Sequence, residues 1–253
     1  MGLEAEVDVS IVVPVYRNGP TLVPLWERID RVLSTEGYRF EVIFVDDNCP
    51  DGSLEIARDL AAARAEVNVV ALRRNVGQHW AVLTGLALSR GSWAVVMDAD
   101  LQDPPEAIPR LLDVDESVMA VFAGRRGRYQ VWHRMLTSRV HKHLLHLACG
   151  VPKDAGIYVA LRRAMIDRIL SLPAATARIV SLIGLTGMPT ASVPVRREVR
   201  PSGSSAYSSW ARLRSALAAY RCVAQTRLRP SKGPVVSVCP TDYLRFGRRF
   251  GTV

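Results

Sequence analysis

Residues 93–106 read WAVVMDADLQDPPE, an apolar run that passes directly into acidic and polar residues. A short, nearly unbroken apolar run is typical of a β-strand that is covered on both faces. Three earlier stretches have the same character, at residues 9–15, 41–45 and 67–72. Stretches with helical length and spacing separate these runs, at residues 21–33, 54–65 and 79–89. The alternation predicts an α/β fold with a mostly parallel central sheet, right-handed crossovers and flanking helices.

Polar residues follow each predicted strand at its carboxyl end. In open parallel sheets, ligands bind in the crevice beyond these ends. The residues that occupy these positions are Tyr16, Asp46, Asp47, Arg73, Arg74, Asp98 and Asp100. The sequence therefore predicts one ligand site built from four strand ends.

Composition bounds the class of protein. The chain has 253 residues, 49% of them hydrophobic, which suits one large or two small packed domains and excludes disorder as the main state. The formal net charge is +9, and all but three of the 33 basic residues are arginine. Because the guanidinium fork matches phosphate oxygens, this excess favours anionic partners. Arginine lies beside aromatic residues at 128–129 and 132–134, but no recognised nucleic-acid-binding motif accompanies these pairs, so we expect no nucleic-acid partner.

We expect neither a membrane span nor a secretory signal. The most tempting uncharged stretch, residues 179–195, is short for a span and contains glycine and proline. Residues 1–6 are acidic and lack the basic and apolar regions of a signal peptide. The four cysteines form no C-x-x-C pair, which favours reduced thiols over disulfides or a zinc site. These features predict a cytoplasmic protein.

The acidic stretch after residue 97 has spacing that suits a metal ion. Asp98 and Asp100 lie two residues apart, and Gln102 adds an amide oxygen just beyond them. Hard oxygen ligands of this kind suit Mg²⁺ or Mn²⁺. A metal held there can stabilise a diphosphate as a leaving group. The alternative is that these acidic residues only cap the next helix.

The second and third strand ends supply further candidates. The carboxylate of Asp46 or Asp47 can accept a hydrogen bond from a base N–H or a ribose hydroxyl, whereas Asp51 or Ser53 can cap the helix that begins near residue 54. Arg74 can offer its guanidinium to a diphosphate or a base. We expect His79, in the same loop, to begin a helix rather than to act as an acid or base.

Five motifs taken together resemble one known family. They are VVPVY at 12–16, VDDN at 45–48, NVGQH at 75–79, MDADLQDPPE at 97–106 and R-x-x-G-x-S-x-Y at 200–207. The ordered set resembles the family 2 glycosyltransferases of the GT-A fold. Within that family it is similar to the polyprenyl-phosphate sugar transferases of the dolichol-phosphate mannosyltransferase and undecaprenyl-phosphate formamido-arabinose transferase types. Asn18 stands where a carboxylate is usual in the family, and Ala206 stands where a lysine is usual.

The resemblance implies a site for a nucleoside-diphosphate sugar, with the UDP, GDP and dTDP forms left open. The residues that it places around this donor are Pro14, Tyr16, Asp46, Asp47, Arg74, Gln78, Asp98, Ala99 and Asp100. It implies that Asp98, Asp100 and Gln102 surround the divalent metal, Mg²⁺ or Mn²⁺. It also implies inverting transfer, in which the acceptor oxygen attacks the anomeric carbon opposite the departing nucleoside diphosphate.

The favoured acceptor is a polyprenyl phosphate. The resemblance places Arg126, Arg134 and Arg200 at the acceptor phosphate. A phosphate with a second pKa of about 6 is already anionic near neutral pH and needs no general base. The alternative acceptor is the hydroxyl or amine of a small molecule, which normally requires such a base. Asp154 is the first candidate for that base and Asp103 the second.

The chain divides into three parts. We assign residues 1–124 to the nucleotide-sugar and metal half, 125–210 to the acceptor half of the same domain, and 211–253 to an amphipathic helix and tail. The later elements that we expect are strands at 154–161 and 191–199 and helices at 163–170 and about 209–226. The last of these helices is basic and amphipathic, and would dock the protein on the inner face of a membrane.

Overall fold

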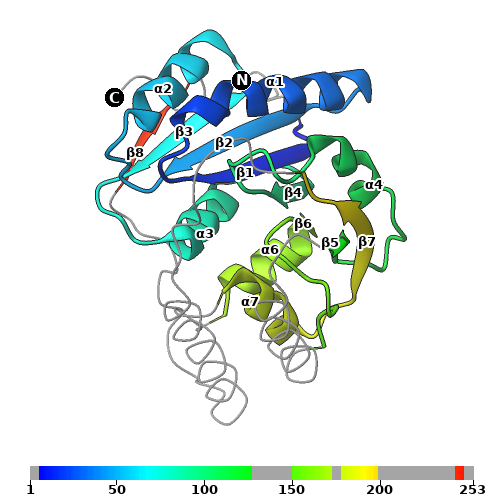
Figure 1. The fold of residues 1–253 in the computed structure, drawn as a ribbon. Helices are drawn as coiled ribbons and strands as arrows, with labels where there is room; N and C mark the ends of the chain where they lie inside the picture. The colour runs from blue at the N-terminus through cyan, green and yellow to red at the C-terminus, as the bar shows by residue number, and fades with distance from the viewer. Residues whose placement is uncertain (1–5, 127–149, 173–177, 199–242, 248–253) are drawn as a thin grey trace.

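The computed structural model describes residues 6–126, 150–172, 178–198 and 243–247. The strands in this part of the chain form one sheet in the order β7-β5-β6-β4-β1-β2-β3-β8 (Figure 1). The strands are β1 (Val9–Val15), β2 (Phe40–Asp46), β3 (Val67–Leu72), β4 (Trp93–Val96), β5 (Ala120–Arg126), β6 (Val159–Arg162), β7 (Thr190–Arg196) and β8 (Tyr243–Phe246). The helices are α1 (Gly19–Thr35), α2 (Ser53–Ala63), α3 (Gln78–Leu88), η1 (Pro105–Ala107), α4 (Ile108–Leu112), α6 (Arg163–Leu170) and α7 (Ile179–Thr186).

The centre of the sheet is parallel, as the apolar runs predict. β1 pairs in parallel with both β2 and β4, and β2 pairs in parallel with β3. Every residue of β1, β3 and β4 is buried, which explains why these strands are apolar on both faces. The prediction of an α/β fold with a mostly parallel sheet is confirmed.

Helices cover both faces of the sheet (Figure 1). One core joins the sheet to α1, α2 and α4, and includes Ile11, Leu25 and Ile108. The other core joins the opposite face to α3, α6 and α7, and includes Leu83 and Ile166. Successive residues of a strand point to opposite faces, so β1 contributes to both cores.

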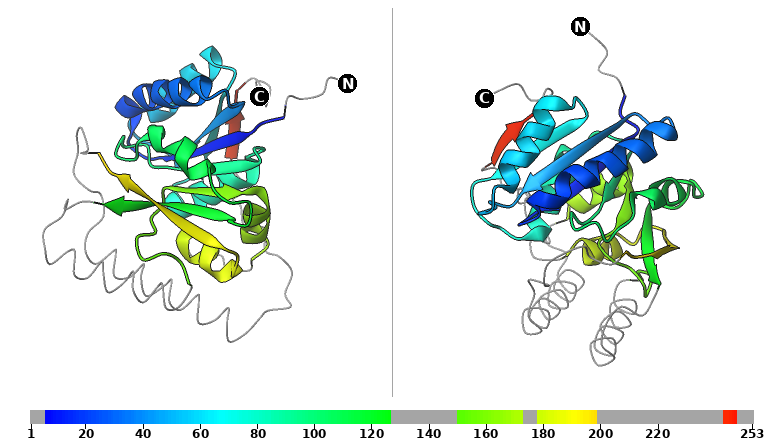
Figure 2. Two further views of the ribbon diagram at one scale, coloured as in Figure 1. Left: turned by 90° about the vertical axis from the view of Figure 1, so that its right-hand side faces the viewer. Right: turned by 45° about the horizontal axis from the view of Figure 1, so that its top comes forward.

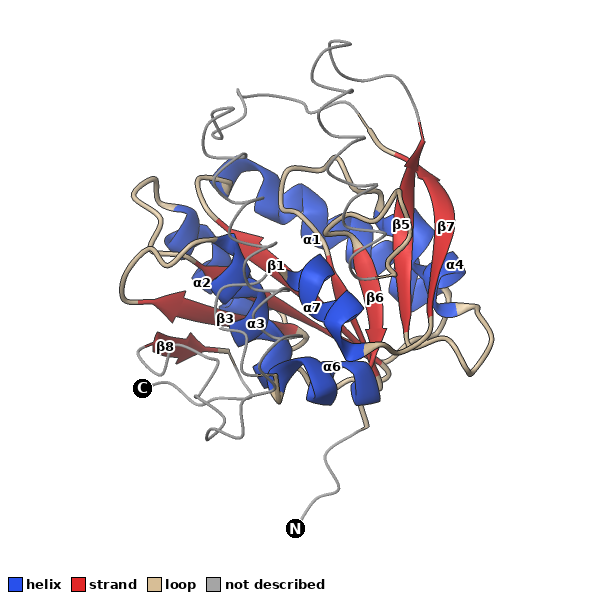
Figure 3. Cartoon of the chain, turned by 90° about the horizontal axis from the view of Figure 1, so that it is seen from below, coloured by secondary structure: helices blue, strands red, loops and turns tan. Residues whose placement is uncertain are grey.

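The second half of the sheet is mixed. β6 is antiparallel to both β4 and β5, whereas β7 is parallel to β5. Figure 3 shows β5 and β7 pointing the same way and β6 pointing the opposite way beside β5. In the order of the sheet, β6 lies between β5 and β4. The carboxyl ends of β5 and β7 therefore lie at the same edge of the sheet as those of β1 to β4.

The elements of this half differ in part from the prediction. The helix at 163–170 is confirmed as α6, but the strand expected at 154–161 is the shorter β6, and the strand expected at 191–199 ends at Arg196. α7 was not predicted, because it is apolar on most sides and followed by Gly187, which gives no helical periodicity. β5 was also not predicted as a strand. The helix expected at about 209–226 lies outside the described residues, and within the described ones no helix is both long and apolar enough to cross a membrane.

A short strand near the C-terminus is the outermost described strand beside β3. β8 pairs antiparallel with residues 69–72 of β3, and Figure 2 shows it in red at the sheet's outer edge. Phe246 packs against the core, and the guanidinium carbon of Arg58 lies 4.3 Å from the centre of its ring. No strong sequence pattern marks this strand, because it has four residues, half of them exposed.

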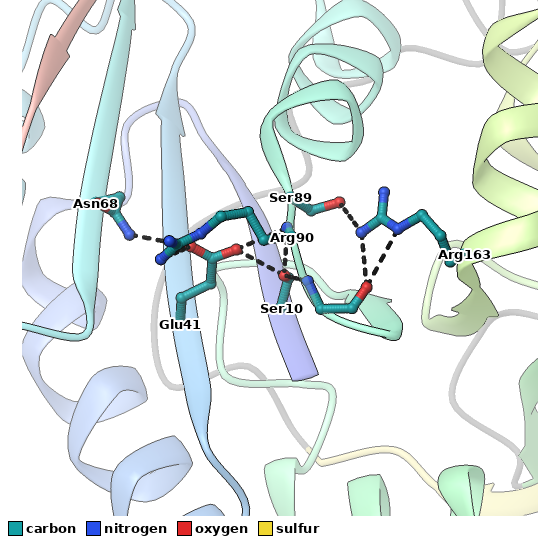
Figure 4. Close-up of polar contacts among 7 residues, drawn as sticks. Ser10, Glu41, Asn68, Ser89, Arg90 and Arg163 are labelled. Atoms are coloured by element: carbon teal, nitrogen blue, oxygen red, sulfur yellow. Dashed lines mark hydrogen bonds and ion pairs between the residues drawn. The ribbon is translucent and has the colours of Figure 1, made fainter. Parts of the chain in front are cut away.

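A buried polar network fastens the amino ends of β1, β2 and β3 (Figure 4). The Glu41 carboxylate accepts hydrogen bonds from Ser10 Oγ at 2.8 Å, from the Arg90 backbone N–H at 2.9 Å and from Asn68 Nδ2 at 3.4 Å. Arg163 donates to Ser89 Oγ in the adjoining turn. The turn between α3 and β4 is thereby held to the edge of the sheet opposite the predicted ligand site.

Candidate active site

The carboxyl edge of the sheet carries unusual backbone geometry. Within the described residues, three residues other than glycine have a positive φ: Arg17 at 58°, Asn48 at 55° and Leu101 at 60°. They follow β1, β2 and β4, respectively. Non-glycine residues in the left-handed region are strained and cluster at functional sites. The strain therefore points to the same edge as the polar residues.

The acidic loop after β4 is the centre of this edge. Asp98 accepts a hydrogen bond from Gln78 Nε2 at 2.7 Å through Oδ1 and one from Arg197 Nη2 at 3.1 Å through Oδ2. The Arg197 Nε also donates to Asp103 Oδ1 at 3.0 Å. The Asp103 carboxylate is buried, with 3% of its side chain exposed. One guanidinium thus links two carboxylates of the same loop.

Arg197 is a site residue that the sequence analysis missed. It directly follows β7, which runs parallel to β5 and delivers the residue to the carboxyl edge. The strand expected at 191–199 placed Arg197 inside a strand, where its side chain had no predicted role. Ending that strand at Arg196, before two charged residues, would have shown Arg197 as a fifth polar strand end.

The donor set of this loop fits a divalent cation. Asp98 and Asp100 lie two residues apart in the loop after β4, and Asp100 Oδ1 accepts the backbone N–H of Gln102 at 3.1 Å. The Arg197 guanidinium forms an ion pair with Asp98, so a positive charge beside this carboxylate is already favourable. The Gln102 side chain is turned to the backbone carbonyl of Glu198, at 3.4 Å from Nε2. In this conformation the described residues contain no group of three His, Cys, Asp or Glu side chains arranged for a metal.

The structure separates the roles of Asp46 and Asp47. Both oxygens of Asp47 are engaged, because they accept the backbone N–H groups of Val76 and Gly77 at 2.7 and 2.8 Å. Asp46 is 1% exposed, and its Oδ2 accepts the Cys49 N–H at 3.3 Å, whereas its Oδ1 is buried with no hydrogen-bond partner in the described structure. Burial raises the pKa of both carboxyl groups. Asp47 thus secures the loop before α3, whereas one oxygen of Asp46 is not used by any hydrogen bond among the described residues.

The expectation that Asp51 or Ser53 caps α2 is wrong in detail, because the cap residue is Gly52 and the helix has no side-chain cap hydrogen bond; the polar contacts at this helix start come instead from Asp51. Its Oδ1 accepts the backbone N–H of Ser53 at 3.3 Å and the Ser53 hydroxyl at 2.6 Å. Gly52 stands at the cap position itself, with a φ of 76°. Asp51 therefore holds Ser53, the first residue of α2, by two hydrogen bonds.

The other predicted donor residues lie along the same edge. Pro14 is buried in β1, Tyr16 is 40% exposed beyond its end, and Arg74 is exposed after β3. Ala99 is buried, and its carbonyl oxygen accepts the Thr21 hydroxyl at 2.5 Å. Ala99 therefore fixes the acidic loop to the start of α1.

His79 is the second residue of α3, as expected for a helix start. Burial, and the nearby Arg178 charge, lower its pKa to about 4. The ring is therefore neutral at physiological pH. Both ring nitrogens are buried without a hydrogen-bond partner in the described part of the chain.

The two candidate bases lie in different places. Asp103 is in the acidic loop, but it is buried and bound to Arg197. Asp154 lies against β5 and β7, where Oδ2 accepts the Ser192 hydroxyl at 2.8 Å and stands over Gly124 so closely that a Cβ there would collide with it. Asp154 thus packs two strands away from β4, and the structure does not bring it together with the acidic loop through any described contact.

The three arginines assigned to the acceptor phosphate are only partly within the described structure. Arg126 is the last residue of β5, and its backbone is in register with Arg196 of β7. It therefore stands at the same carboxyl edge as Arg197. Arg134 and Arg200 lie outside the described residues.

Solved structures define the class of fold. A mannosyltransferase from Pyrobaculum calidifontis, solved with GDP-Man and Mn²⁺, aligns with a TM-score of 0.63 over 90% of this chain and 66% of its own, at 21% identity. Glucosyl-3-phosphoglycerate synthase from Mycobacterium tuberculosis, solved with Mn²⁺, UDP-Glc and glycerol 3-phosphate, aligns with a TM-score of 0.61 over 90% and 83%, at 20% identity. The fold is that of the GT-A glycosyltransferases.

The sequence then places the chain in a family within this fold class. Residues 10–169 match the model of glycosyl transferase family 2, so the chain belongs to that family. It is 35% identical over 203 residues to undecaprenyl-phosphate 4-deoxy-4-formamido-L-arabinose transferase of Aeromonas hydrophila, and 35% identical over 204 residues to the protein of that name from Edwardsiella ictaluri. Each alignment covers 79% of this chain and 62% of the relative. The resemblance to polyprenyl-phosphate sugar transferases is confirmed.

Proposed function

We propose that this protein transfers a sugar from a nucleoside-diphosphate sugar to a polyprenyl phosphate, with inversion and with the help of a divalent cation. The observation that carries the proposal is that one edge of the sheet holds both the acidic loop at residues 98–103 and an Asp46 oxygen that is buried with no hydrogen-bond partner among the described residues. The names of the 35% identical relatives support the acceptor class. The complexes of the two structural neighbours support the donor class and the metal.

The donor would lie across the strand ends. Asp46 would accept a hydrogen bond from the base or ribose, beside Tyr16 and Arg74. Asp98 and Asp100 would hold the metal, and Gln102 would join them after its amide turns away from Glu198. When bound, a divalent cation neutralises the charge that develops on the departing diphosphate.

The acceptor would approach from the β5 and β7 side of the edge. Arg126, Arg134 and Arg200 would orient its phosphate and offset its repulsion from the donor diphosphate. The attacking oxygen is already anionic, so no side chain has to remove a proton. Asp154, whose carboxylate accepts the Ser192 hydroxyl, has no catalytic role in this proposal.

Thermal unfolding with nucleotides tests the donor site. UDP, GDP, dTDP and the corresponding nucleotide-sugars are each added with and without Mn²⁺. One of the three nucleotides, together with its nucleotide-sugars, is expected to raise the midpoint of thermal unfolding by roughly 5–10 °C at a hundredfold excess over Kd, and only when Mn²⁺ is present. The Asp98→Asn and Asp100→Asn variants should lose this shift, whereas Asp59→Asn, on the exposed face of α2, should keep it. The proposal fails if no nucleotide stabilises the wild-type protein in a metal-dependent way.

Transfer assays test the acceptor. Undecaprenyl phosphate is expected to accept the sugar, and Arg134→Ala should lower kcat/KM by about 10²-fold or more, while Asp154→Asn retains activity. The opposite pattern, with activity lost in Asp154→Asn and kept in Arg134→Ala, would favour a small-molecule hydroxyl or amine as acceptor.

Sedimentation with anionic lipid vesicles tests the proposed site of action at the cytoplasmic membrane face.

A further inference from the structure

Arg197 joins two carboxylates that differ in their surroundings. Asp103 is 3% exposed in its side chain and accepts from Nε, whereas Asp98 is 19% exposed and accepts from Nη2. A buried carboxylate that loses its charge partner strongly destabilises a protein. The contact between Arg197 and Asp103 therefore stabilises the fold. The contact with Asp98 is the more exposed of the two. Asp98 is also the carboxylate that would hold the metal in the proposed function.

The backbone on both sides of this contact is fixed. The Glu198 N–H donates to the Gln102 carbonyl at 2.9 Å. Arg28 forks to the carboxylates of Glu106 and Glu198, with Nη2 distances of 2.7 and 2.6 Å. The strand end that carries Arg197 is therefore held against the acidic loop by contacts that do not involve Arg197 itself.

We propose that Arg197 is a positioning residue that neutralises Asp98 in the absence of donor and competes with a divalent cation for it. The inference rests on the proposed function, because it takes Asp98 as a metal-holding residue. A guanidinium and a divalent cation repel each other across one carboxylate. The cation binds well only when the nucleotide diphosphate adds negative charge, and the Nη2 arm then leaves Asp98 while Nε keeps Asp103. Arg197 thereby makes metal binding depend on the nucleotide.

Mn²⁺ binding without nucleotide tests this role directly. Free Mn²⁺ is measured by its electron paramagnetic resonance signal during titration of the wild-type protein, Arg197→Gln and Arg197→Lys. Arg197→Gln should bind Mn²⁺ roughly tenfold or more tightly than the wild type, and Arg197→Lys, which keeps the charge, should stay close to the wild type. With saturating UDP or GDP, whichever binds, the difference between Arg197→Gln and wild type should shrink to about threefold or less.

Two controls distinguish the loss of the Arg197 charge from a loosening of the chain segment after β7. Arg28→Gln frees the same strand end without removing the charge at Asp98, so its Mn²⁺ affinity should match the wild type. If Arg197→Gln does not fold, the Arg197→Gln/Asp103→Asn double variant removes the buried pair as a unit and should show the same tighter binding. Equal tightening in Arg28→Gln, or unchanged or weaker binding in the Arg197 variants, overturns the inference. Metal-dependent nucleotide binding by the wild type in that case leaves the proposed function standing, whereas its absence removes both.

Discussion

At the scale of single residues, Asp46 and Asp47 are neighbours with opposite consequences for stability. Asp46→Asn removes a charge that burial opposes, and should raise the midpoint of thermal unfolding at pH 8. Because the folded-state pKa is raised, stability falls as the pH rises from about 4 through that pKa, so the gain of the variant should disappear toward pH ~4. The same variant should bind the nucleotide more weakly, as expected where stability is given up for binding.

Asp47→Asn is the matched comparison. Asn offers only one oxygen to the two backbone N–H groups of Val76 and Gly77, so one of them loses its acceptor. The expected cost is about 1–3 kcal/mol in the free energy of unfolding, measured by urea denaturation at pH 7.5. A stabilising Asp47→Asn, or a destabilising Asp46→Asn, would contradict the division of roles between the two.

At the scale of elements, α3 depends on a glycine for its contact with the sheet. A Cβ on Gly85 would collide with Val12 Cγ1 in β1 and lie 3.1 Å from Val45 Cγ2 in β2. Gly85→Ala should therefore cost about 1–3 kcal/mol of stability, despite the higher helix propensity of alanine. Ala87→Ser, on the exposed side of the same helix, should change stability by no more than about 0.5 kcal/mol. Chemical denaturation of the two variants makes the comparison.

Because Gln78 is the first residue of α3, the position of this helix also affects the candidate active site. Gly85→Ala should weaken metal-dependent nucleotide binding, since Gln78 donates to Asp98 from the first turn of the displaced helix. Ala87→Ser should leave that binding unchanged. Equal binding by both variants would show that α3 adjusts without moving its first turn.

The amino ends of the strands offer a separate test. Glu41→Gln places an amide N–H₂ among the donors of Ser10, Asn68 and Arg90, and should lower stability by roughly 2–3 kcal/mol. Nucleotide affinity should not change, because the network is at the edge opposite the site. Glu66→Gln, an exposed substitution nearby, serves as the control in denaturation and binding measurements. A loss of affinity in a folded Glu41→Gln protein would contradict this separation.

A feature of this fold can be predicted from the sequence where a short stretch of residues determines it, and not where it depends on contacts between distant segments. The strands β1 to β4 and the acidic loop at Asp98 are readable from short stretches, since burial on both faces requires apolar runs and a strand end exposes its next residues. Arg197 is not, because its role arises only when β7 lies parallel to β5. The choice between Asp46 and Asp47 likewise depends on where the loop before α3 turns its N–H groups.

At the scale of the whole molecule, β8 is the outermost described strand beside β3, and Phe246 is its anchor. Phe246→Ala should lower the free energy of unfolding by about 2 kcal/mol, since the ring packs on the core beneath Arg58. Leu244→Ala should have little effect, because Leu244 is 45% exposed. Thermal unfolding compares the two, and size-exclusion chromatography follows association through an uncovered β3 edge. Equal midpoints for the two variants would contradict the assignment of Phe246 as anchor.

Because β8 pairs with β3, the edge of β3 is covered only late in the synthesis of the chain. Leu72 is paired with Tyr243, so β3 waits for about 170 further residues before its edge is covered. At translation rates of roughly 5–20 residues per second, this delay is on the order of 10–35 s. Throughout this delay the nascent chain presents the unpaired backbone of an apolar strand, while β2, which ends in Asp46, and β4, which precedes Asp98, can already be in place. The yield of folded protein should thus respond to chaperone supply and translation speed.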